Sequence, residues 1–212
     1  MTSFLNPGAA AVAAFDSRSQ LRLPADLRLT PEQFERVCAE NPEAVLELAA
    51  DGQLITMTPT GGETGSRNGE LILQLKLFTR GNRGWKVFDS STGFRLPDGS
   101  VLSPDASLVS QQRWEALSAQ ERSSFVPLCL DLVVELASPS DEGPRGLTAL
   151  RRKMAAYQSN GARLGWLILP QECAVEVWPA SGEPKRLEQQ EWLDAGSEFP
   201  GLRLELAEIW AG

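Results

Sequence analysis

The segment Leu132-Val133-Val134-Glu135-Leu136-Ala137-Ser138 decides the fold, because it is an apolar, β-branched run that carries a single acid. Such a run predicts a buried strand. A similar run, Ser103-Pro104-Asp105-Ala106-Ser107-Leu108-Val109, lies upstream, within a strand that we expect over residues 101–109. Asp105 and Glu135 are therefore acids on or beside buried strands, where an ion without a partner costs several kcal/mol. Such acids usually face a cation, a metal ion or a cleft.

A helix is predicted after the second strand. Its apolar residues recur at helical spacing and are Leu147, Leu150, Met154 and Tyr157. Lys153 lies beside this apolar stripe, so we expect its stem to point inward, whereas Arg151 and Arg152 should point more toward solvent. The two acids and this inward lysine could therefore converge. Asn160-Gly161 predicts the end of the helix.

The segment after the helix predicts a βαβ crossover. Residues 164–169 are continuously apolar, which is typical of a central strand with a parallel neighbour. The order strand, strand, long helix, strand indicates an α/β fold with a mixed sheet. Residues 173–178 and 185–187 should add an antiparallel edge, and the tail over residues 202–210 should pack back onto the core.

The first half of the chain predicts a helix and a hairpin before the core. Thr30-Pro31-Glu32-Gln33 is typical of a helix start, and this helix should end near Glu40. Asp51-Gly52 predicts a hairpin between residues 45–48 and 53–57. We expect Glu47 to bond within this hairpin, with a direct role in a metal site as the alternative.

Further elements complete the predicted topology. A glycine-rich loop over residues 59–65 should precede a helix over residues 66–79 that is covered on most sides. Strands are expected over residues 85–89 and 93–96, and a short surface helix over residues 111–121.

Composition restricts the chemistry. The 212 residues include no histidine, which excludes Ser-His-Asp and Cys-His catalysis and histidine metal sites. The three cysteines are far apart and fit reduced thiols. A formal net charge of −8 argues against a general nucleic-acid coat protein, although it leaves room for a local basic groove.

The chain predicts one domain without a membrane segment. Residues 1–20 show no periodicity and suggest a flexible arm, and residues 21–212 are long enough for a single core. The N-terminus lacks the basic region of a signal peptide, and no stretch has the ~20 apolar residues of a membrane span. We therefore expect a cytoplasmic protein.

Several motifs together resemble the Uma-type restriction endonuclease family of the PD-(D/E)XK nuclease superfamily, formerly a domain of unknown function. The likeness spans roughly residues 21–210. The motifs that carry it are Glu47-x4-Gly52 with Thr58-Pro59, Ser103-Pro104-Asp105, the stretch from Val134 to Asp141, Lys153-Met154-x2-Tyr157-x3-Gly161, and Trp166-Leu167-Ile168. Ala137 stands where the superfamily name implies a lysine, so Lys153 takes that role, and Asn68 stands where many members carry a histidine.

The resemblance implies a restriction endonuclease-like α/β fold, a mixed sheet flanked by helices, with the N-terminal helix and hairpin added. It also implies Mg²⁺-dependent hydrolysis of DNA phosphodiester bonds, with Mn²⁺ as a substitute. Asp105 and Glu135 would hold the metal with the backbone carbonyl of Leu136, because hard cations prefer oxygen donors. Lys153 would assist the attacking water, and Glu70 could anchor a metal-bound water.

Two hypotheses of different class stand at this point. The first is the metal-dependent nuclease, for which a homodimer is a hypothesis that rests on the two-fold symmetry of duplex DNA. The second is a non-catalytic binding or assembly module that keeps the nuclease fold. The acidity of the chain favours the module slightly, and the set of Asp105, Glu135 and Lys153 favours the nuclease more.

Overall fold

A six-stranded mixed sheet forms the centre of the computed structural model, which describes residues 24, 26–141 and 143–211. The arm predicted over residues 1–20 lies outside the described residues. The strand order is β10-β9-β8-β7-β6-β3. The six strands in chain order are β3 (Trp85–Asp89), β6 (Ala106–Ser110), β7 (Leu132–Leu136), β8 (Leu164–Leu169), β9 (Ala174–Pro179) and β10 (Lys185–Glu188).

The predicted βαβ crossover is confirmed. Strands β7 and β8 are parallel, and helix α5 (Pro144–Ser159) connects them, whereas all other pairs in this sheet are antiparallel. Both parallel strands are buried along their whole length, which agrees with their continuous apolar sequence. Strands β9 and β10 form the expected antiparallel edge.

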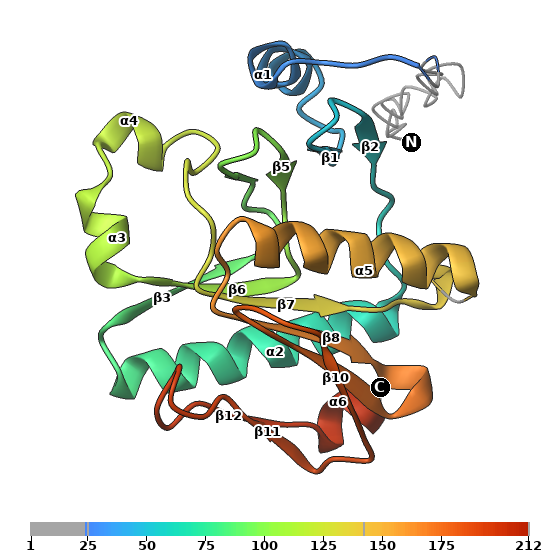
Figure 1. Cartoon of the computed structure of the whole chain (residues 1–212), viewed down its shortest axis with the longest axis vertical. Helices are drawn as coiled ribbons and strands as arrows, with labels where there is room; N and C mark the ends of the chain where they lie inside the picture. The colour runs from blue at the N-terminus through green and yellow to red at the C-terminus, as the bar shows by residue number, and fades with distance from the viewer. Residues whose placement is uncertain (1–23, 25, 142, 212) are drawn as a thin grey trace, which may run out of the picture.

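Helices α5 and α2 (Gly62–Gly81) cover opposite faces of the sheet (Figure 1). Alternate residues of β7 divide between two core clusters: Val134 packs with Leu71 and Leu75 of α2, and Val133 packs with Met154 and Tyr157 of α5. The C-terminal hairpin of β11 (Trp192–Asp194) and β12 (Arg203–Glu205) packs with α6 (Ala207–Ala211) on the α2 side. The expected packing of the tail is therefore confirmed.

A second, four-stranded sheet lies beside the core on the α5 side (Figure 1). It contains the predicted hairpin, formed by β1 (Leu46–Leu48) and β2 (Leu54–Thr56), with β5 (Val101–Leu102) and β4 (Phe94–Arg95). Gly52 has a positive φ of 82°, as the Asp-Gly turn predicts. Helix α1 (Pro31–Glu40) begins with the expected capping box of Thr30 and Gln33.

The prediction of a single strand over residues 101–109 is wrong. The chain leaves the small sheet after β5 and enters the main sheet at β6, with Ser103-Pro104-Asp105 between them. Pro104 has no N–H to donate, and the N–H of Ser103 is used by the Glu47 side chain, 2.8 Å away. The break therefore has a local cause, and it places Asp105 directly before β6.

Two predicted helices also differ from the structure. Helix α2 begins at Gly62 inside the predicted glycine-rich loop. In this added turn Thr64 is buried and Glu63 pairs with Arg67, which is itself buried and donates through Nε to the Ile209 carbonyl at 2.8 Å. The helix predicted over residues 111–121 is divided into α3 (Gln111–Ala116) and α4 (Ala119–Arg122). Ser118 starts the second of these with its own capping box.

Helix α2 is covered on one face only, which corrects the expectation of cover on most sides. Leu71 and Leu75 are fully buried, whereas Leu73 and Leu77 are 50% and 53% exposed. In the described part of the chain, no helix has both the length and the apolar character needed to cross a membrane.

We predict that Leu71→Ala lowers the free energy of unfolding by roughly 3 to 4 kcal/mol, since it leaves a cavity between α2 and the sheet. Leu73→Ala on the same helix should change it by less than about 0.5 kcal/mol, because this side chain is half exposed. Urea unfolding of the two variants measures the difference. Equal losses would contradict the one-sided burial of α2.

Candidate active site

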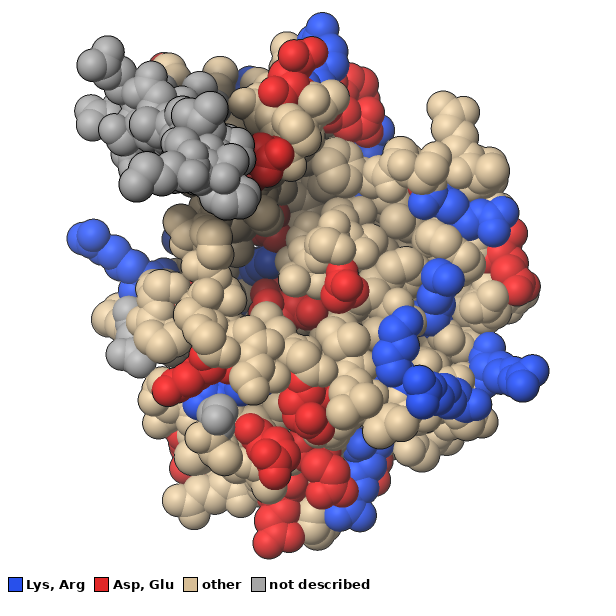
Figure 2. Space-filling model, turned by 180° about the vertical axis from the view of Figure 1, so that it is seen from behind, with Lys and Arg blue, Asp and Glu red and all other residues tan. Residues whose placement is uncertain are grey.

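The candidate site lies where β6 begins and β7 ends. Ala106 pairs with Val134 in the antiparallel register, and this register continued by one residue places Asp105 opposite Glu135. The break between β5 and β6 brings Asp105 to this position, and the apolar run of β7 carries Glu135. Figure 2 shows a recess on the left of its view, on the side toward which β7 points in Figure 1, with acidic and basic side chains on its floor.

Asp105 is fixed by two donors from different elements. Its Oδ2 accepts from the backbone N–H of Leu136 at 2.8 Å, and its Oδ1 accepts from Nδ2 of Asn68 on α2 at 3.0 Å. Burial raises the pKa of the Asp105 carboxyl above its ordinary value, although these hydrogen bonds and the charge of Lys153 oppose that shift. One strand, β7, and one helix, α2, thus hold this carboxyl in place.

Lys153 of α5 joins the parts of the site. Its Nζ lies 2.9 Å from Oε1 of Glu135 and 2.8 Å from Oε1 of Glu47, and it donates to the Ser103 carbonyl at 2.9 Å. An ammonium group has three donors, so all three are used by acceptors of the protein. The predicted convergence of the lysine with Glu135 is therefore present, and Ser103 ties this cluster to Asp105 two residues later.

Glu47 belongs to this cluster, and the expectation that it bonds within its own hairpin is wrong. Its side chain is 3% exposed, and its Oε1 accepts from the Ser103 N–H as well as contacting Lys153. The reason is tertiary: β1 pairs with β5 on the side opposite β2, and this pairing brings Glu47 beside the chain that follows β5. The sequence signal was an acid between two leucines in a short apolar strand.

Three carboxylates around one ammonium group leave an excess of negative charge. Burial, together with the charges of Asp105 and Glu47, raises the pKa of Glu135 to about 8 against the attraction of Lys153. Burial alone would lower the pKa of Lys153, but Glu135 and Glu47 outweigh it and raise that pKa above the ordinary value. The lysine therefore stays charged, and Glu135 holds a proton more readily than an exposed glutamate.

Tyr157 lies one helical turn after Lys153 and supports the same acid. Its hydroxyl donates to Oε1 of Glu135 at 3.2 Å. Burial raises the pKa of the Tyr157 phenol well above its ordinary value, so the hydroxyl remains a donor. The apolar periodicity of α5 predicted its burial in the core, and the structure adds the polar contact.

Glu70 is not brought to this cluster. Its carboxylate accepts from Nε2 of Gln74 at 2.9 Å, and Gln74 is bonded to the backbone of Glu205 on β12. Asn68 faces Asp105, and two residues correspond to about 200° around a helix, so Glu70 points to the other side. Its position lends no support to a role in anchoring a metal-bound water.

The donor set fits a hard divalent cation. Among the described residues, Oε2 of Glu47 and Oε2 of Glu135 accept no hydrogen bond, and Oδ1 of Asn68 is buried without one. These are oxygen atoms, as Mg²⁺ and Mn²⁺ prefer. Within the same described ranges, no three His, Cys, Asp or Glu side chains form a ready metal site. Lys153 instead occupies the position of counter-ion between two of the carboxylates.

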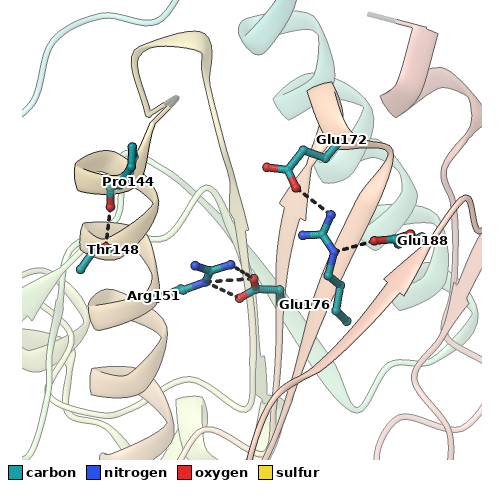
Figure 3. A network of polar contacts seen from close by, with 7 residues as sticks. Pro144, Thr148, Arg151, Glu172, Glu176 and Glu188 are labelled. Carbon is teal, nitrogen blue, oxygen red and sulfur yellow. Dashed lines mark hydrogen bonds and ion pairs between the residues drawn. The ribbon is translucent and has the colours of Figure 1, made fainter.

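Helix α5 is held over the sheet by a second acid and base pair. Arg151 binds Glu176 of β9 through Nε at 2.9 Å and through Nη2, and Figure 3 shows this pair between the helix and the strand. The Arg151 side chain is 43% exposed against 12% for Lys153, so the expectation that Arg151 points more toward solvent is confirmed. The structure adds its ion pair with Glu176, which is 5% exposed. The sheet register places Glu135, Leu167 and Glu176 in one row. Lys153 and Arg151 therefore attach α5 to two acids of the same row.

A sequence profile described as "Putative restriction endonuclease", the Uma2 family, matches residues 31–207. This match covers most of the chain. The chain belongs to the Uma2 family. Glu47, Asp105, Glu135 and Lys153 all lie inside the matched region.

The fold agrees with the assignment to Uma2. The chain is similar to a crystal structure titled as a putative nuclease belonging to DUF820 from Anabaena variabilis, with a TM-score of 0.69 and 18% sequence identity. The similarity covers 86% of this chain and 98% of the other. At this identity the likeness shows the fold, which is the restriction endonuclease-like fold that the sequence predicts. No curated protein matches the sequence.

We predict that the protein loses stability relative to its Glu135→Gln variant as the pH rises from about 5 to about 8. Glu135 has a raised pKa in the fold, so its contribution is present below the ordinary value of 4.5 and is lost as the pH approaches about 8. Each unit of pKa difference corresponds to about 1.4 kcal/mol. Urea unfolding at several pH values measures this, with Glu40→Gln on the exposed side of α1 as the control. Parallel pH profiles for the protein and Glu135→Gln would contradict the raised pKa.

We predict that Arg151→Ala lowers the free energy of unfolding by roughly 2 to 3 kcal/mol, because it leaves the buried Glu176 carboxylate without its partner. Arg186→Ala is the matched control, since Arg186 pairs with Glu172 and Glu188, which are more exposed than Glu176 and are labelled in Figure 3. It should cost less than about 1 kcal/mol. Thermal and urea unfolding compare the two, and equal effects would contradict the anchoring role of Arg151.

Proposed function

We propose that the protein is a Mg²⁺-dependent endonuclease that hydrolyses phosphodiester bonds of DNA. The single observation that carries this proposal is the convergence of Glu47, Asp105, Glu135 and Lys153 at one edge of a restriction endonuclease-like sheet. Membership of the Uma2 family supports the same reaction class. Mn²⁺ could replace Mg²⁺, since both accept oxygen ligands.

Each residue of the site would have its own chemical role. Asp105 and Glu135 would hold the metal ion, with the Leu136 carbonyl as a predicted further ligand and Glu47 as a third carboxylate. When bound, the ion would lower the pKa of a water molecule and offset charge on the phosphate. Asn68 and the Leu136 N–H orient Asp105, and Tyr157 orients Glu135.

Lys153 would hold the attacking water or offset negative charge on the phosphate oxygens through Nζ. Its three donors are occupied by Glu47, Glu135 and Ser103, so one of these bonds must break before Nζ can donate to water or phosphate. The two Oε2 atoms that accept no hydrogen bond belong to Glu47 and Glu135, whose Oε1 atoms contact Nζ. A cation that draws these acids away would therefore free the lysine.

The non-catalytic module remains the second candidate. The observation that favours it is that Lys153 is fully satisfied by acceptors of the protein itself, as in a purely structural cluster. A homodimer and a cytoplasmic location stay predictions from the sequence.

We predict that the protein nicks or linearises plasmid DNA with Mg²⁺ or Mn²⁺, and that Asp105→Asn and Lys153→Met each reduce the rate by about 10²-fold or more. Glu70→Gln should keep activity near that of the unchanged protein, because Glu70 belongs to a different network. Gel assays measure the rates, and circular dichroism verifies folding.

Equal cleavage by Lys153→Met would reject the site assignment. Metal titration by calorimetry separates the two candidates, because a module without a metal site would neither bind Mg²⁺ nor cleave DNA while remaining folded.

A further inference from the structure

We propose that a basic surface at the β3 edge of the main sheet binds the phosphate backbone of duplex DNA. The surface comprises Lys76, Arg80, Arg83, Lys86 and Arg122. The inference rests on the proposed function, because it names a second contact of the same substrate.

The sequence concentrates positive charge in this part of an acidic chain. Residues 71–88 contain four Lys or Arg residues and no Asp or Glu, although the whole chain has a formal net charge of −8. These residues cover the second half of α2, the turn after it and most of β3. A local excess of one sign within a chain of the other sign creates a field that attracts polyanions to that surface.

Within the described ranges, no acid of the protein pairs with the cations of this surface, although Arg122 donates through Nε to the Ser118 carbonyl at 3.4 Å. In the described part of the chain, none of the five forms an ion pair, whereas Arg95, Arg151 and Arg186 each bind one or two acids. Lys76, Arg80, Arg83 and Arg122 are exposed, and Lys86 is half-buried. Lys86 and Arg122 lie over the ring of Trp114, at 4.9 Å and 6.0 Å from its centre. Trp114 thus holds two cations in place without neutralising them.

The surface wraps around a free sheet edge. Strand β3 pairs only with β6 among the described strands, so it forms one edge of the main sheet. Figure 2 shows Lys and Arg side chains gathered on the right of its view, which is the side of β3, α3 and the end of α2 in Figure 1. Cations on an edge strand also discourage edge pairing, but Lys76, Arg80 and Arg83 lie outside β3 and that explanation does not cover them.

The distance to the candidate active site suits a single duplex. Val109 pairs with Lys86, and the four residues from Asp105 to Val109 span about 14 Å of strand. The twelve residues from Asn68, which holds Asp105, to Arg80 span about 18 Å of helix. These lengths equal about four to five base-pair steps of B-DNA. The separation between the candidate active site and the basic surface is therefore within the length of a short duplex.

The test measures DNA binding without cleavage. A labelled duplex of random sequence is titrated with the protein in EDTA at several salt concentrations, and fluorescence anisotropy gives the affinity. The variant Arg80→Glu/Arg83→Glu is compared with Arg36→Glu/Lys185→Glu, which reverses two exposed cations elsewhere and changes the net charge equally. The neutral variant Arg80→Gln/Arg83→Gln repeats the comparison should the first variant fold poorly.

We expect Arg80→Glu/Arg83→Glu to bind at least tenfold more weakly at moderate salt. The slope of log affinity against log salt should become shallower by about 2, because two phosphate contacts are lost. The control variant should bind as the unchanged protein does. Equal loss in both variants, no loss in either, or no duplex binding by the unchanged protein at low salt would overturn the proposal.

Two further binding measurements distinguish this proposal from its alternatives. Preference for anionic phospholipid vesicles or for duplex RNA over duplex DNA would overturn the choice of DNA. Glu70→Gln should bind DNA as the unchanged protein does, since Glu70 belongs neither to the basic surface nor to the candidate active site. Cleavage that does not depend on Arg80 and Arg83 would refute only this inference. If the folded protein binds DNA through Arg80 and Arg83 but never cleaves it, only the proposed nuclease activity would be refuted.

Discussion

The arrangement of the candidate site depends on one ammonium group that three segments of the chain share. Lys153 of α5 contacts Glu135 of β7, Glu47 of β1 and the Ser103 carbonyl between the two sheets. A buried ammonium group without such partners would be unstable, and so would the buried carboxylates without it. The small sheet, the main sheet and the crossover helix therefore meet at one cluster of charged groups. In this cluster the ammonium group and the carboxylates stabilise one another.

The architecture around this point is organised to hold it rigid. The break at Pro104 sends the chain from the small sheet to the main sheet and brings the Ser103 backbone and the Asp105 side chain to the same place. Arg151 fixes α5 on Glu176, two residues before Lys153 on the helix. Such support from neighbouring elements is how a fold fixes the geometry of reactive groups. The carboxylates outnumber the ammonium group, and a divalent cation would neutralise the negative charge that remains.

The acidity of the protein is unevenly distributed, and this matters for its relation to nucleic acid. The acids of the candidate site are buried and bound to partners, whereas the cations of the basic surface are mostly exposed and form no ion pairs in the described part of the chain. Net charge alone argued against a DNA-binding role, but net charge averages over surfaces that a ligand meets separately. The local distribution is the relevant quantity for a polyanion.

The sequence by itself determined the α/β crossover, the N-terminal helix and the hairpin, because apolar periodicity, a capping box and an Asp-Gly turn are local signals. It also predicted that Asp105, Glu135 and Lys153 lie at the edge of the core. Only the tertiary structure decided that Glu47 joins them, that Glu70 does not, and that Arg151 is an anchor. These outcomes depend on which strands pair and on which face of a helix meets a neighbour. Both follow from contacts between distant residues, and local patterns of sequence do not encode such contacts.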